Sequence, residues 1–91
     1  MTDRPYQVDL APATMRQLAR LPPGAAAGLR GPILALAIEP RPPGSRKLVG
    51  GELWRLRIGP LRVVYAIDDD RRLVIVVKVA RRSESTYRRV R

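Results

Sequence analysis

The sequence contains no cysteine, no histidine and no phenylalanine. Without cysteine, disulfides, thiol nucleophiles and thiolate-bound metals are excluded. Without histidine, the commonest general base and the commonest metal ligand near neutral pH are also missing. Any chemistry of this chain must therefore depend on other groups.

Long apolar runs are also missing, since none approaches the roughly 20 residues that a membrane span needs. The N-terminal stretch MTDRPYQVDL has no apolar signal-peptide core. We therefore expect a cytoplasmic protein with no membrane partner. The length of 91 residues and the 45% hydrophobic content predict a single globular domain over residues 1–91.

Acidic residues are few, and the net charge is +10. Residues 1–40 are nearly neutral, with four Arg against three acidic residues, whereas residues 41–91 carry 14 Lys and Arg against five. This asymmetry indicates a polyanionic partner for the second half of the chain. The alternative is that these basic side chains only keep that half soluble.

The first 40 residues predict a strand and a helical hairpin. Residues 6–10 alternate between apolar and polar side chains, as a strand does. Pro12 suits a first helical turn, and that helix has an apolar stripe of Met15, Leu18 and Leu21. A second helix, ending at Pro40, has an apolar face of Leu29, Ile33, Leu36 and Ala37. Glycine and proline in its middle predict a kink or a late start.

Beyond residue 47 the apolar period changes from that of a helix to the two-residue period of a strand. Strands are expected at 53–58, 61–67 and 73–80, joined by short turns, whereas the Pro- and Gly-rich residues 41–47 predict a loop. The sum is a two-layer α+β domain with an N-terminal strand, a two-helix hairpin, an antiparallel three-strand meander and a short C-terminal tail.

Three arginines interrupt these strands. On the first strand of the meander, Trp54 and Leu56 share one face, and Arg55 and Arg57 share the other. Since a helical hairpin covers only one face of a sheet, the arginines should point outward. Arg62 follows the Gly-Pro turn and joins them if its apolar neighbours pack under the helices. The three guanidiniums would then share a patch about 10 Å across.

Clustered guanidiniums repel one another, and a polyanion would relieve that repulsion by bringing phosphates to them. We therefore interpret Arg55, Arg57 and Arg62 as a phosphate-binding group. The alternative is that each is a solvated side chain lying over its apolar neighbours.

The residues that carry these arginines also resemble a known family. KLVGGELWRLRIGPLRVVYAIDDD, residues 47–70, followed by VVKVARRSESTYR, residues 76–88, resembles the RelE toxins of type II toxin–antitoxin systems. The most specific parts are the W-R-L-R-x-G-x-x-R-V-V-Y-x-I-D-D core and the R-R…Y-R ending. The resemblance implies a RelE-like fold, similar to that of small microbial ribonucleases.

The resemblance also implies an activity. RelE toxins enter the ribosomal A site and cut mRNA there, with the 2′-hydroxyl as the internal nucleophile and with no metal or other cofactor. By resemblance, Arg62 and Arg82 are expected to stabilise the transition state, and Arg57 and Tyr87 complete the catalytic group. The tyrosine could exchange a proton, stack on a base or only pack the tail. An RNA-binding group is expected to consist of Arg55, Arg81, Lys47 and Arg46.

Some positions depart from the family pattern. Arg55 and Arg57 stand where lysines are frequent, and arginine cannot act as a general base. Leu61 replaces a usual tyrosine, and Arg81 replaces a common histidine. These departures favour a slow or ribosome-dependent nuclease, and they leave open a member that has lost cleavage.

The resemblance further implies a cognate antitoxin, a small acidic protein with an extended segment that covers the basic face. Promoter DNA is expected to be bound only indirectly, through that antitoxin. Two alternatives to the ribonuclease stay open. One is a ParE-like toxin that binds DNA gyrase, and the other is an RNA-binding protein that does not cleave.

Overall fold

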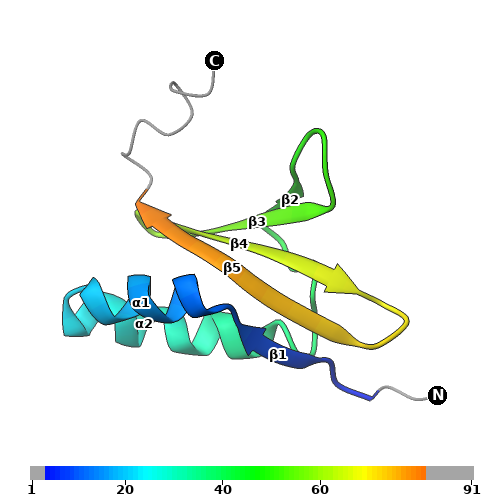
Figure 1. The fold of residues 1–91 in the computed structure, drawn as a ribbon, viewed down its shortest axis with the longest axis horizontal. Helices are drawn as coiled ribbons and strands as arrows, with labels where there is room; N and C mark the ends of the chain where they lie inside the picture. Colours follow the sequence, from blue (N-terminus) through cyan, green and yellow to red (C-terminus); the bar gives the residue numbers. More distant parts are fainter. Residues whose placement is uncertain (1–3, 82–91) are drawn as a thin grey trace.

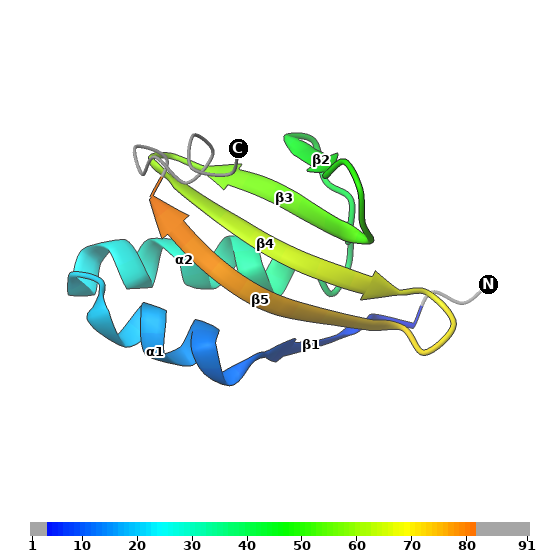
Figure 2. The same cartoon turned by 45° about the horizontal axis from the view of Figure 1, so that its top comes forward.

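The structure, a computed structural model, describes residues 4–81 and consists there of two helices packed on one side of a five-stranded sheet (Figures 1 and 2). In chain order the elements are β1 (Gln7–Leu10), α1 (Pro12–Arg20), α2 (Pro23–Ala35), β2 (Ser45–Lys47), β3 (Leu53–Ile58), β4 (Leu61–Asp68) and β5 (Leu73–Arg81). The α+β class predicted from the sequence is confirmed.

The strands lie in the order β1-β5-β4-β3-β2. β3, β4 and β5 form the predicted antiparallel meander, and β1 pairs parallel to β5. The loop predicted at 41–47 is wrong for its last three residues, because Ser45–Lys47 form β2 against β3. The prediction missed this strand because three residues are too few to show an alternating pattern. The strand forms because its backbone groups pair with the edge of β3.

The core lies between the helices and the sheet. Leu29, Ile33 and Leu36 are buried as predicted, and they face buried residues of the meander: Leu56, Leu61, Val63, Tyr65, Val74, Val76 and Val79. The Tyr65 hydroxyl donates a hydrogen bond of 2.8 Å to the Pro40 carbonyl oxygen. Burial raises the pKa of Tyr65. This bond ties the segment after the helices to the centre of the sheet.

The predicted stripe of α1 is wrong at Met15, which is 57% exposed. Thr14 is fully buried instead, and its hydroxyl donates a 2.8 Å hydrogen bond to the Val76 carbonyl oxygen. That bond, between residues 62 apart in the sequence, fixes which side of α1 meets the sheet. α2 begins at Pro23 and continues through Pro32 to Ala35, so the predicted late start and the predicted end at Pro40 are both wrong. Neither described helix is both long and apolar enough to cross a membrane.

Candidate nucleic-acid interface

The register of the sheet places the arginines of β3 and β4 together. Arg57 lies directly opposite Arg62, and Arg55 lies directly opposite Arg46 of β2. All four occupy the face opposite the buried Leu56 and Val63, so the helices do not cover them. The predicted grouping of Arg55, Arg57 and Arg62 on one open face is therefore what the structure shows.

A lysine joins these arginines. Lys78 of β5 lies opposite Val64 of β4, which in turn lies opposite Arg55. We call the set the basic face: Arg46, Arg55, Arg57, Arg62 and Lys78. With adjacent strands about 4.8 Å apart, the set spans four strands, about 14 Å.

The sequence analysis missed Lys78 because strict alternation along β5 would place it beside Val74 and Val76, under the helices. A register shift between Val64 and Tyr65 overturns that expectation, since Tyr65 pairs with Val76 but Val64 pairs with Lys78. The extra residue is a β-bulge, which reverses the faces of the residues that follow it. The signal in the sequence was the pair of adjacent valines at 76 and 77, which interrupts the alternation.

The side chains of the basic face differ in how much of their surface is exposed. Arg55 and Arg62 are half-buried, whereas Arg57 is exposed. The buried Nε of Arg55 has no hydrogen-bond partner among the described residues. Within residues 4–81, salt bridges join Arg41 to Asp69 and Arg71 to Asp68, and neither of these uses Arg55 or Arg57. These two salt bridges therefore leave the guanidiniums of Arg55 and Arg57 without a carboxylate of the described residues, and a phosphate is an anion that can pair with them.

Other predicted site residues lie apart from the basic face or outside the described chain. Lys47 pairs with Trp54, and Arg81 pairs with Leu61, so both are at register positions of the helix side. Both are exposed, and Arg81 is at the end of β5. Arg82 and Tyr87 lie outside the described residues 4–81.

A second polar cluster lies at the β4–β5 turn. The Arg41 guanidinium donates to both oxygens of Asp69, at 2.9 and 3.3 Å, and the Tyr6 hydroxyl donates to the same carboxylate at 2.6 Å. Arg41 and then Tyr6 lower the pKa of Asp69, and the hydrogen bond to Asp69 raises the pKa of both Tyr6 and Arg41. Arg41 also lies 5.2 Å from the ring centre of Trp54. The cluster ties residue 41 to the turn, and Trp54 is half-buried beneath it.

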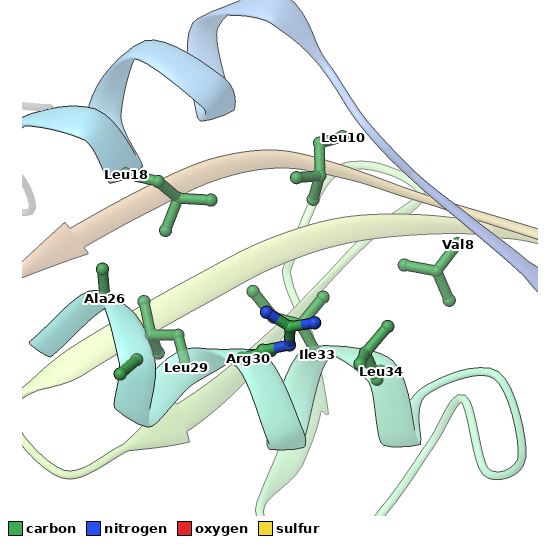
Figure 3. Close-up of a pocket in the computed structure, with 9 residues that line it drawn as sticks. Val8, Leu10, Leu18, Ala26, Leu29, Arg30, Ile33 and Leu34 are labelled. Atoms are coloured by element: carbon green, nitrogen blue, oxygen red, sulfur yellow. The ribbon is translucent and has the colours of Figure 1, made fainter.

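An apolar groove of about 480 Å³ lies between β1, α1 and α2. Figure 3 shows the apolar side chains of these elements turned toward a common space, together with the guanidinium of Arg30. We call this the helix groove, and its main apolar lining is Val8, Leu10, Leu18, Leu29, Ile33 and Leu34. It is separate from the basic face, because α1 and α2, which line it, pack on the opposite side of the sheet.

Carboxylates are not grouped as metal ligands in the part of the chain that the structure describes, where no three acidic residues stand close enough to hold an ion. The charged groups of the basic face are instead four guanidiniums and one ammonium. This set suits a polyanion, and it can engage phosphate oxygens two at a time.

Comparison with known proteins agrees with the sequence resemblance. Residues 8–86 match the model of a family described as the ParE toxin of the type II toxin–antitoxin system parDE. A protein named Toxin RelE, from Mycobacterium tuberculosis strain H37Rv, is 39% identical over 87 residues, which cover 91% of this chain and 88% of that protein.

Solved structures share the fold. The toxin–antitoxin complex RelBE2 from Mycobacterium tuberculosis contains a chain that is 27% identical with a TM-score of 0.81, covering 91% of this chain and 98% of that one. The archaeal RelE–RelB complex from Pyrococcus horikoshii contains a chain that is 25% identical with a TM-score of 0.77. The match covers 87% of this chain and 97% of that one.

Proposed function

Because this chain belongs to the RelE/ParE family of toxins from type II toxin–antitoxin systems, we propose that it is a ribosome-dependent endoribonuclease. It would cut mRNA in the ribosomal A site and so inhibit translation. The observation that supports this proposal most is the basic face, on which Arg57 and Arg62 stand directly opposite each other. An RNA phosphate between them would meet two preplaced guanidiniums.

The chemistry needs charge stabilisation above all. When a 2′-oxygen attacks phosphorus, negative charge develops on the equatorial phosphate oxygens. A fixed donor aimed at such charge contributes roughly 3–4 kcal/mol. We assign that role to Arg62 with Arg57, and we assign binding of the flanking RNA backbone to Arg55 and Arg46. Arg82 and Tyr87 are further proposed catalytic residues, by family resemblance.

Mapping the 5′ ends of cellular mRNA after induction of the protein tests this function. Ribosome-dependent cleavage predicts new 5′ ends within translated frames and in phase with codons. The matched control is translation blocked by an antibiotic before induction, which should remove the cuts. Unchanged mRNA ends during growth arrest would refute the ribonuclease function.

A second candidate is the gyrase-poisoning activity for which ParE toxins are known, and it is favoured by the family model that the chain matches. Toxicity would then come from contact with gyrase rather than from the basic face. The same induction experiment separates the two activities, since gyrase poisoning predicts a DNA-damage response with intact mRNA. A third outcome, RNA binding with steep salt dependence but no cuts, would indicate a member without catalysis.

We also propose that a cognate antitoxin neutralises this protein. One of the two structural relatives above is described as a toxin–antitoxin complex, and the other as a RelE–RelB complex. The net charge of +10 favours an acidic partner. The helix groove adds an apolar surface, and Arg30 beside it can pair with a carboxylate of an apolar antitoxin segment. Binding of promoter DNA would then belong to the antitoxin.

Leu34→Asp tests the groove. Leu34 lines it and is 56% exposed, so the change should leave the fold intact. We expect the affinity for the antitoxin to fall at least tenfold, because a carboxylate would replace an apolar contact and would compete with the antitoxin for Arg30. Isothermal titration calorimetry with purified antitoxin measures this. Ile38→Asp is the matched control, since Ile38 is 76% exposed and does not line the groove. Equal affinities of the two variants would contradict the assignment.

A further inference from the structure

The basic face contains four arginines and one lysine, and only the lysine can readily transfer a proton. A guanidinium keeps its proton in proteins, whereas an ammonium can give up one of its three. Phosphodiester cleavage requires such a transfer, because the departing 5′-oxygen must gain a proton. Within the basic face, Lys78 is the residue that has this chemistry.

The position of Lys78 suits the task. Arg62 pairs with Ala80, two positions along the same face of β5, so Lys78 and Arg62 are diagonal neighbours on adjacent strands. Diagonal neighbours lie about 7–8 Å apart at the backbone, within the reach of long side chains. Ala80, directly opposite Arg62, has only a methyl group. The ammonium of Lys78 can therefore meet the same phosphodiester that Arg62 contacts.

The β-bulge is what turns Lys78 to this face. Without the register shift between Val64 and Tyr65, Lys78 would share the face of Val74 and Val76, both fully buried. A charged side chain there would be costly. Bulges are over-represented next to active sites, where they re-aim side chains. Here the bulge adds the ammonium of Lys78 to the basic face, whose other members are arginines.

Carboxylates on this face stand at the far end of the sheet. Asp9 of β1 pairs with Ile75, and Asp68 of β4 pairs with Leu73 at the beginning of β5. By register, Arg62 is two positions from Val64, the partner of Lys78, whereas Asp9 lies opposite Ile75, three positions from Lys78. The ammonium therefore stands among guanidiniums, at the end of the sheet where a phosphate would bind.

We propose that Lys78 is the general acid of RNA cleavage, an inference that rests on the ribonuclease function proposed above. The 2′-oxygen forms a bond to phosphorus, and its proton passes to solvent water. The bond between phosphorus and the 5′-oxygen breaks, and the 5′-oxygen takes a proton from the Nζ of Lys78. The products are a 2′,3′-cyclic phosphate and a 5′-hydroxyl, and Lys78 regains its proton from water.

Single-turnover cleavage of mRNA on purified ribosomes tests the proposal with Lys78→Ala, Lys78→Arg and wild-type protein. We expect both variants to be about 100-fold slower or more, which is the usual contribution of general acid–base catalysis. Lys78→Arg keeps the positive charge, so a slow rate in this variant would show that proton transfer, and not charge alone, is needed. Added methylamine or ethylamine should restore the rate of Lys78→Ala in proportion to the protonated amine. Arg16→Ala on exposed α1 is the control and should match the wild type.

The outcomes separate this proposal from the function itself. The role of Lys78 would be overturned if the wild-type protein cleaves and Lys78→Arg is equally fast. It would also be overturned if added amines do not restore the rate of Lys78→Ala. Neither result would affect the proposed ribonuclease function. No cleavage by the wild-type protein would overturn the ribonuclease function. Urea unfolding of each variant confirms that a slow rate does not come from an unfolded protein.

Discussion

Arg62→Ala is expected to slow mRNA cleavage on the ribosome by about 100- to 1,000-fold, the usual effect of removing one preplaced donor to developing negative charge. Arg62 lies opposite Arg57 at the beginning of β4, on the face that the helices leave open. A cleavage assay under single-turnover conditions measures the loss. Relief of growth arrest on induction gives the corresponding result in cells.

The fold should survive this change. The buried side chains of β4 are Leu61, Val63 and Tyr65, which point to the opposite face. We therefore expect the free energy of unfolding to change by less than about 1 kcal/mol in urea titrations, as for substitutions outside a core. Arg62→Lys should retain part of the rate, because a point charge replaces a two-pronged donor. A fully active Arg62→Ala variant would show that the basic face does not perform the chemistry.

Tyr65→Ala should have the largest effect on stability, lowering the free energy of unfolding by about 3–5 kcal/mol. Tyr65 is among the largest fully buried side chains, and its hydroxyl satisfies the Pro40 carbonyl oxygen. The loss is large beside the 5–15 kcal/mol typical of whole domains. Urea unfolding followed by circular dichroism measures it.

Tyr65→Phe separates the two contributions of this residue. It keeps the ring in the core and removes only the hydrogen bond to Pro40, so we expect a loss of about 1 kcal/mol. If Tyr65→Phe were as unstable as Tyr65→Ala, the hydrogen bond rather than the packing of the ring would dominate. Cleavage activity of the folded fraction should be unchanged in Tyr65→Phe, since the hydroxyl lies on the helix side of the sheet.

Local pattern was sufficient to predict much of the fold. Alternation in β3 and β4 correctly assigned Arg55, Arg57 and Arg62 to the face opposite Leu56, because each strand runs without interruption through these residues. The apolar face of α2 was also correct, with Leu29, Ile33 and Leu36 buried. These features depend on the period of one element, which the sequence displays directly.

Features that depend on contacts between distant residues could not be predicted in the same way. The orientation of α1 depends on the hydrogen bond from Thr14 to the Val76 carbonyl oxygen, which no helical period contains. β2 forms because its backbone pairs with the edge of β3, a pairing that no local pattern of the sequence displays. The place of Lys78 depends on the register of β5 against β4. The candidate site was therefore predicted without Lys78, the lysine that we propose as its general acid.

The parallel pairing of β1 with β5 has a consequence for synthesis of the protein. Gln7 pairs with Leu73, and Leu10 with Val76, so the sheet cannot close until β5 has left the ribosomal exit tunnel. Contacts so distant in the sequence also slow folding. A nascent chain that carries only β1, α1 and α2 therefore has neither the core nor the basic face. The surfaces that a toxin of this fold needs are thus assembled only when nearly the whole chain has emerged.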